Sequence, residues 1–143
     1  MIHFVSISTF RRRLSSLLKV KRNVYTSAPS AICDAFKGAT IDEIRKNRDM
    51  VLLDDYSIVV KLRLPDKRQR LSKADGYRLI YMVMKQVPLV VQLDIYPKRG
   101  PSQQLDIERF EIERLVSEFR AEMLSDILVE HDINNNLEEI IGQ

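Results

Sequence analysis

Positively charged side chains recur through the middle of the sequence, and their types suit contact with phosphate groups. Arginine presents a planar guanidinium that pairs with two phosphate oxygens, whereas lysine places a compact charge beside one. The cations of this region are Lys61, Arg63, Lys67, Arg68, Arg70, Lys73, Arg78, Lys98 and Arg99. We therefore expect a polyanionic partner, above all a nucleic acid.

The charge of the chain is unevenly divided, which supports the same expectation. The 143 residues include 23 Lys and Arg against 20 Asp and Glu, a formal net charge of +3. Residues 1–105 hold 20 of the basic and 9 of the acidic residues and so carry +11, whereas residues 106–143 carry −8. The acidic end is expected to keep the protein soluble, or to lie against the basic body or a second copy and compete with the polyanion.

Composition argues against several other classes of protein. With 45% hydrophobic residues, the chain can bury a core as one domain and is not disordered. No apolar run approaches the roughly 20 residues of a membrane-spanning helix, and the first residues lack a secretory pattern. One cysteine, Cys33, and two distant histidines, His3 and His131, argue against a disulfide and a zinc cluster. We expect a cytoplasmic protein with no cofactor, no metal and no membrane partner.

The N-terminal part is predicted to form a strand followed by two helices. Alternation over residues 2–5 indicates a short strand, and Ser8 or Thr9 can cap the helix that follows. That helix carries one apolar stripe, formed by Phe10, Leu14, Leu17 and Leu18. Pro29 can open a second helix, and residues 41–49 indicate a helical turn or a loop.

Alternating apolar and polar residues predict three strands in the middle of the chain, over residues 57–64, 77–84 and 89–96. Short connections make these strands antiparallel neighbours. Lys61 and Arg63 share one face of the first strand, and ordinary pairing would place Arg78 and Tyr96 beside them. The pattern therefore predicts a basic sheet face that Lys98 and Arg99 adjoin.

A 3.6-residue spacing of apolar side chains predicts a helix over residues 105–130. The acidic segment over residues 121–143, which includes the end of this helix, has three open interpretations. It competes for the basic face, it is an exposed amphipathic extension, or it makes a homodimer through the C-terminal helix. The residues expected to form the dimer contact are Met123, Leu124, Ile127 and Leu128.

Four short segments resemble blocks of the RelE/ParE superfamily of small bacterial toxins. KADGYRLIYMV (Lys73–Val83) resembles the family's Lys-(Ser/Ala)-Gly-Gly/Tyr-Arg-(Leu/Val)-Ile-Tyr block, and LDIYPKRGP (Leu93–Pro101) resembles its Ile-Tyr-X-Lys block. YSIVVKLRL (Tyr56–Leu64) is similar to the strand that precedes them, and STFRRRLSSL (Ser8–Leu17) is similar to the first helix. The four segments occur in the family's order, and the resemblance covers about residues 1–119.

The resemblance implies an α+β fold of the RelE-like kind. This is a small antiparallel sheet in the order strand, helix, helix, strand, strand, strand, with helices packed on one face and an extended C-terminal helix. It implies a toxin domain over residues 1–119 and an acidic helical extension over residues 120–143. It also implies the toxin of a type II toxin–antitoxin module, neutralised by a cognate antitoxin protein. RelE-like and HigB-like members cut mRNA, usually on the ribosome, whereas ParE-like members inhibit DNA gyrase.

The resemblance further implies roles for individual residues in cleavage of RNA by its own 2′-hydroxyl. Arg78 and Arg99 match the positions that hold the scissile phosphate in RNA-cleaving members. We expect Lys61 to hold a flanking phosphate or polarise the hydroxyl, and Tyr96 to stack on a base or transfer a proton. Contact with the RNA backbone is expected of Arg63, Lys98, Lys67, Arg68, Arg70 and Lys73.

Two departures from the family pattern keep a second function open. Leu105 lies near the place of a tyrosine found in RNA-cleaving members, and no histidine is close to the proposed site in the sequence. The alternative is a binding protein without nuclease activity, such as a gyrase inhibitor or a module that pairs with an antitoxin. Lys61 and Arg63 could also be ordinary outward residues, and Arg78 a buried arginine paired with Asp94 or another carboxylate.

Overall fold

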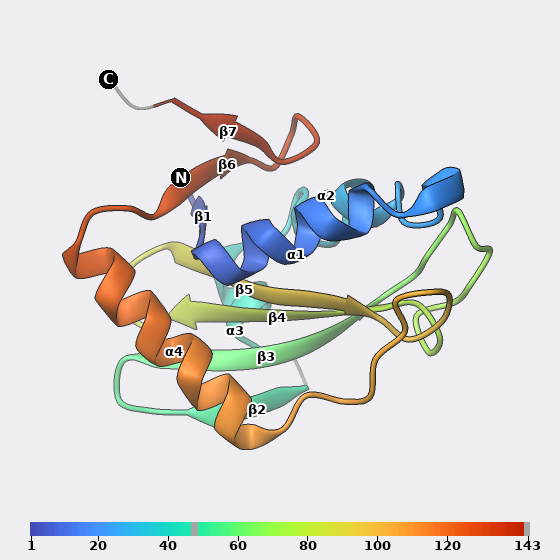
Figure 1. Cartoon of the computed structure of the whole chain (residues 1–143). Helices are drawn as coiled ribbons and strands as arrows, with labels where there is room; N and C mark the ends of the chain where they lie inside the picture. The colour runs from blue at the N-terminus through green and yellow to red at the C-terminus, as the bar shows by residue number, and fades with distance from the viewer. Residues whose placement is uncertain (47–48, 142–143) are drawn as a thin grey trace.

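A computed structural model describes residues 1–46 and 49–141 of the chain. Within these residues the central feature is one seven-stranded sheet with the order β2-β3-β4-β5-β1-β6-β7 (Figure 1). The strands are β1 (His3–Ser6), β2 (Met50–Leu53), β3 (Ser57–Leu64), β4 (Tyr77–Met84), β5 (Leu89–Pro97), β6 (Val129–Asp132) and β7 (Glu138–Ile140). The helices are α1 (Ser8–Leu18), η1 (Lys21–Asn23), α2 (Ala28–Phe36), α3 (Ile41–Arg45) and α4 (Arg109–Leu124). None of these helices is long and apolar enough to cross a membrane.

The three central strands lie where the alternation predicts them. β3 and β4 have the predicted bounds, and β5 continues one residue further, to Pro97. β3 pairs antiparallel with β4, and β4 with β5, which confirms the predicted meander. β1 joins the other side of β5, and theirs is the one parallel pairing among the described strands. The protein is therefore of the α+β class, with a mostly antiparallel sheet.

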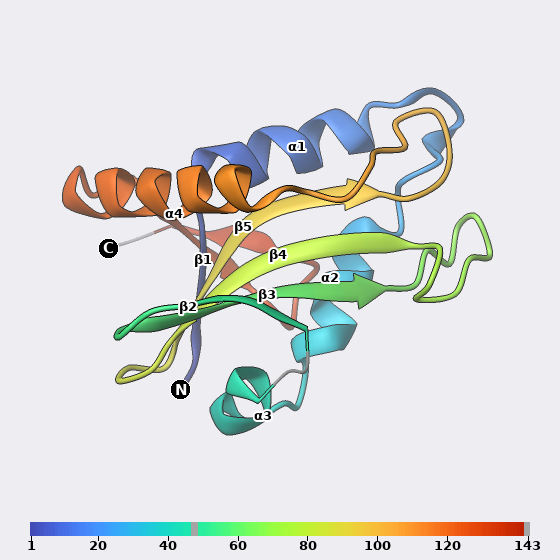
Figure 2. The ribbon, with the colours of Figure 1, turned by 90° about the horizontal axis from the view of Figure 1, so that it is seen from below.

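The prediction that the helices pack on one face of the sheet is wrong, because helices cover both faces. Figure 2 shows α1 and α4 on one side of the central strands and α2 and α3 on the other. On β4, Tyr81 packs against Phe36 of α2, whereas the next residue, Met82, shares an apolar hollow with Phe119 of α4. Seven of the eight residues of β4 are buried, as expected of a strand with apolar residues in both directions.

The prediction of a continuous helix and helical extension at the C-terminus is wrong beyond Leu124. There α4 ends, and β6 and β7 form a hairpin that adds two strands beside β1. Asp126 adopts a left-handed conformation, with φ 55°, and this ends the helix although the apolar spacing continues. Three residues of this segment are buried: His131, Ile133 and Leu137. The hairpin is therefore part of the core, and residues 142–143 of the expected extension lie outside the described residues.

The connection between β3 and β4 depends on a glycine at its end. A Cβ atom on Gly76 would collide with the carbonyl oxygen of Leu64 and lie 2.8 Å from the backbone nitrogen of Asp66. Only glycine therefore allows the start of β4 to approach the end of β3 so closely. This close approach fixes the two strand ends that carry Arg63 and Arg78.

Candidate functional site

The ends of β3, β4 and β5 bring four of the expected site residues onto one face of the sheet. Arg63 lies opposite Arg78 in the β3–β4 register, and Arg78 lies opposite Tyr96 in the β4–β5 register. Residues directly opposite each other on neighbouring strands project from the same face. Lys61, two residues before Arg63, projects from this face as well. Together with Lys98, which follows β5, the cations Lys61, Arg63 and Arg78 form what we call the basic patch.

An acidic residue that the sequence analysis did not include lies within the basic patch. Nζ of Lys98 donates a hydrogen bond to Oδ1 of Asp106 at 3.2 Å, and Nζ of Lys61 lies 3.9 Å from the same oxygen. The hydrogen bond from Lys98, with the charges of Lys61 and Arg78, lowers the pKa of Asp106 below its usual value. The carboxylate is therefore ionised at neutral pH. Its side chain is 60% exposed.

Arg78 is buried, but its partners are backbone carbonyls rather than a carboxylate. Its guanidinium donates to the carbonyl oxygens of Lys73 at 3.1 Å, Ala74 at 2.8 Å and Tyr77 at 3.2 Å. The alternative interpretation of Arg78 is right about its burial and wrong about its pairing with Asp94, because Asp94 pairs with Arg13 of α1, with 3.2 Å between Nε and Oδ1. These bonds use three of the five N–H groups of the guanidinium, and through them Arg78 fixes the connection before β4.

Arg99 lies next to the basic patch and is held by the same connection. Its Nη2 donates to Oδ1 of Asp75 at 2.8 Å, and its Nη1 donates to the carbonyl oxygen of Lys98 at 3.2 Å. Asp75 directly follows Ala74, whose carbonyl accepts from Arg78. The two arginines matched to the scissile phosphate are therefore linked through one turn. More than half of the Arg99 side chain is exposed.

Tyr96 is fully buried and anchors the segment that leads into α4. Its hydroxyl accepts a hydrogen bond from the backbone N–H of Ile107 at 3.1 Å. Burial raises the pKa of the Tyr96 hydroxyl, so the phenol stays protonated at neutral pH. A ring with no exposed surface cannot stack on a base in this arrangement.

Two basic residues of the connection between β3 and β4 contact residues outside the basic patch. Lys67 lies 3.5 Å from Asp34 of α2, and Arg68 donates to the carbonyl oxygen of Arg22 at 3.2 Å. Lys67 and Lys73 also border a hollow of about 360 Å³ against α2. Arg70, like Lys73, is exposed. The structure therefore divides the expected RNA-binding residues between two places.

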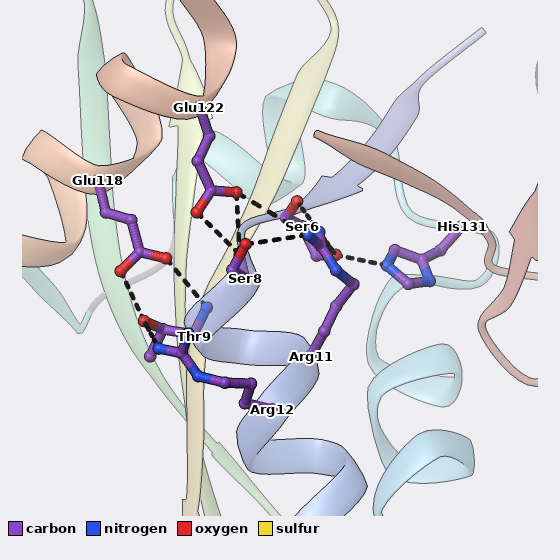
Figure 3. Close-up of polar contacts among 8 residues, drawn as sticks. All are labelled: Ser6, Ser8, Thr9, Arg11, Arg12, Glu118, Glu122 and His131. Atoms are coloured by element: carbon purple, nitrogen blue, oxygen red, sulfur yellow. Dashed lines mark hydrogen bonds and ion pairs between the residues drawn. The ribbon is translucent and has the colours of Figure 1, made fainter. Parts of the chain in front are cut away.

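Glutamates of α4 cap the first turn of α1, a contact that local sequence does not reveal. The N–H of Ser8 donates to both oxygens of Glu122, at 3.0 and 3.2 Å (Figure 3). The N–H and hydroxyl of Thr9 donate to Glu118 at 3.0 and 2.6 Å. The sequence predicts a cap from Ser8 or Thr9 itself, but their side chains make no such bond. Their spacing of four residues places the two glutamates on one face of α4 but does not indicate which segment they contact.

A serine and a histidine beside this cap have the geometry of a nucleophile and its base, but they are buried. Oγ of Ser6 lies 2.6 Å from Nε2 of His131 (Figure 3). Nδ1 of His131 lies 2.8 Å from the carbonyl oxygen of Leu137. Arg11 also donates to Oγ of Ser6 at 3.1 Å. Burial lowers the pKa of His131, so the ring is neutral. Because Ser6 has no exposed surface, we interpret this contact as a structural link between β1 and β6.

A polar cleft of about 350 Å³ separates α1 from α4. Asp94 lies at its base, where burial raises the pKa of the carboxyl to about 6 despite the opposing charge of Arg13. Arg13 also donates to the side chain of Gln104 at 2.7 Å. Glu111 and Arg114 of α4 line the other wall. The cleft therefore holds charges of both signs rather than a single field.

No known family, curated protein or solved structure matches this chain at a significant level. Among the described residues, no group of three or more His, Cys, Asp or Glu side chains is arranged to hold a metal ion.

Proposed function

We propose that the chain is a RelE-like toxin of a type II toxin–antitoxin module. It cleaves mRNA on the ribosome, in the cytoplasm, as a metal-independent endoribonuclease. The observation that carries this proposal is the basic patch, where cations from neighbouring strands meet. Further support comes from the antiparallel meander of β3, β4 and β5, which follows an N-terminal strand and helices; α3 and β2 are additions to the order that the resemblance implies.

In the proposed reaction, the 2′-oxygen of a ribose bonds to the adjacent phosphorus while the bond from phosphorus to the 5′-oxygen breaks. Lys61, Arg63 and Lys98 hold the phosphate oxygens, and the charge of Arg78 stabilises the negative charge that develops on them. Lys61 or Lys98 gives a proton to the leaving 5′-oxygen, and water accepts the proton of the 2′-hydroxyl. Arg99 joins the phosphate when it releases Asp75. The products are a 2′,3′-cyclic phosphate and a free 5′-hydroxyl.

A second candidate function is RNA binding without cleavage, or inhibition of another target such as DNA gyrase. Three observations favour it. The Tyr96 hydroxyl already accepts a hydrogen bond from the N–H of Ile107, and the guanidinium of Arg78 already gives three hydrogen bonds to backbone carbonyls. Leu105, near the place of the family's tyrosine, is 86% exposed and offers no proton. Such a protein would use the basic patch for binding and would not cleave RNA.

Incubation of the purified protein with RNA in excess EDTA separates these candidates. The nuclease proposal predicts fragments that end in 2′,3′-cyclic phosphate. It also predicts at least about a hundredfold slower cleavage by the double variant Lys61→Ala/Lys98→Ala. The matched control is Lys19→Ala/Lys37→Ala, which removes two exposed lysines outside the patch and should cleave at the wild-type rate. Absence of cleavage by the wild type, with or without ribosomes, would overturn the nuclease proposal.

The expected partners follow from the same proposal. Induced expression should stop translation before any DNA-damage response, whereas the reverse order would indicate a gyrase inhibitor. A cognate antitoxin, or a second copy of the chain, would contact apolar side chains left exposed near the end of α4. These are Met123, Leu124 and Ile127.

A further inference from the structure

The Lys61–Lys98 pair of the basic patch already holds an anion, the carboxylate of Asp106. A carboxylate between two ammonium groups presents the same kind of oxygen as a phosphodiester. The distances of 3.2 Å from Lys98 and 3.9 Å from Lys61 leave no room for a phosphate oxygen to replace Oδ1 unless Asp106 moves. The contact therefore occupies part of the surface that RNA would use.

Bonds on both sides of Asp106 hold its segment in place without help from the two lysines. Before it, Gln104 donates its N–H to the carbonyl oxygen of Pro97 at 3.0 Å and accepts from Arg13 at 2.7 Å. After it, the N–H of Ile107 donates to the buried hydroxyl of Tyr96. The backbone thus presents Asp106 to the basic patch, while its side chain stays exposed enough to swing away.

We propose that Asp106 is an internal phosphate mimic that occupies the Lys61–Lys98 subsite and competes with the RNA backbone. This inference rests on the proposed function, because it assumes that the patch takes a sugar–phosphate chain. RNA binds only after the carboxylate has released the two lysines, so this contact lowers the affinity of the free protein for RNA. A partner that moves residues 104–107 away from Lys61 and Lys98 therefore raises the affinity of the protein for RNA.

The test is the affinity for a 2′-O-methyl RNA oligonucleotide, which binds but cannot be cleaved. Asp106→Asn should bind about threefold to tenfold more tightly than the wild type, because both ion pairs are lost. The control Glu108→Gln removes the same charge from an exposed residue of the same segment and should change affinity much less. Equal affinities of the two variants would overturn the inference.

A double variant gives a second and independent test. In Lys98→Gln/Asp106→Asn, loss of the carboxylate should bring little gain over Lys98→Gln alone, because Asp106 then competes for one lysine only. A full gain in this background would contradict the proposal. Asp106 and Glu108 are exposed, so the melting temperatures of Asp106→Asn and Glu108→Gln should match that of the wild type.

The outcomes also separate this inference from the nuclease proposal. If the wild type does not cleave RNA but Asp106→Asn binds the oligonucleotide more tightly than Glu108→Gln, the nuclease proposal fails and the inference stands. If the wild type cleaves RNA and the two variants bind equally, the inference fails and the nuclease proposal stands.

Discussion

Arg78 combines a structural and an electrostatic role within one side chain. Its guanidinium gives three hydrogen bonds to the turn before β4, and its charge lowers the pKa of Asp106. Its neighbour across the strands, Arg63, is exposed and makes no bond of this kind among the described residues. Replacing each of these two arginines in turn therefore separates the structural role of Arg78 from the effect of its charge.

Arg78→Ala should lower the free energy of unfolding by about 2–3 kcal/mol, because three carbonyls of the turn lose hydrogen bonds from a charged donor. Arg63→Ala, which removes the same charge from an exposed site, should change it by no more than about 0.5 kcal/mol. Urea unfolding measures both. Equal losses of unfolding free energy in the two variants would show that the bonds from Arg78 to the turn do not stabilise the protein.

Asp94 makes the stability of the protein depend on pH. Burial raises its pKa from 3.8 to about 6, so the folded state holds a proton that the unfolded state has already released between these values. The contribution of Asp94 to stability is therefore complete below about pH 3.8 and is lost as the pH rises to about 6.

Asp94→Asn removes this titration. Relative to the wild type, the variant should gain up to roughly 3 kcal/mol of unfolding free energy between pH 3.8 and pH 7. Unfolding curves at both pH values measure the difference, with Asp126→Asn as an exposed control. A constant difference between wild type and Asp94→Asn would mean that the carboxyl titrates normally.

At the scale of the elements, the sequence predicts what local alternation determines. The strands over residues 57–64 and 77–84 are found as predicted, because their alternation is uninterrupted and turns bound them. β6 and β7 are only four and three residues long, too short for a period to register. The end of α4 also escapes prediction, because a single left-handed residue, Asp126, stops a helix whose apolar spacing continues.

The contact of α4 with the start of α1 is a further feature beyond local sequence. Glu118 and Glu122 accept from N–H groups that lie more than 100 residues earlier in the chain. Burial alone would raise the pKa of Glu118, but the bonds from Thr9 outweigh it and lower the pKa. The Glu118 carboxylate therefore stays ionised where the positive end of the α1 dipole favours it.

Glu122→Ala should lower the free energy of unfolding by about 1–2 kcal/mol, as the loss of a helix cap does. Glu113→Ala, on the exposed face of the same helix, is the matched control and should cost less than about 0.5 kcal/mol. Thermal or urea unfolding checks both variants. If Glu122→Ala is no less stable than Glu113→Ala, the cap does not stabilise α1.

At the scale of the whole molecule, the acidic C-terminal part does not cover the basic patch. β6 and β7 lie at one edge of the sheet, and β4, β5 and β1 separate them from β3, which carries Lys61 and Arg63. The acid that does reach the patch is Asp106, the first residue of the negatively charged part. Charge counts predicted that acids compete for the basic surface, but only the path of the chain shows which one.

The cations of the site could be predicted, but their partners could not. Strand pairing follows a regular register, and this places four site residues on one face of the sheet: Lys61, Arg63, Arg78 and Tyr96. The positions of Arg99 and of the loop from Lys67 to Lys73 depend instead on irregular turns. Hydrogen bonds between distant segments, such as that from Lys98 to Asp106, set the final arrangement.

The salt dependence of RNA binding tests most directly whether the basic patch binds the sugar–phosphate backbone. Affinity for the 2′-O-methyl oligonucleotide is measured over a salt series for wild type, Lys61→Ala, Lys98→Ala and the control Lys19→Ala. The account predicts that each patch variant lowers the slope of log affinity against log salt by about 0.7, the value for one lost phosphate contact. Slopes unchanged in both patch variants, or lowered equally in Lys19→Ala, would contradict it.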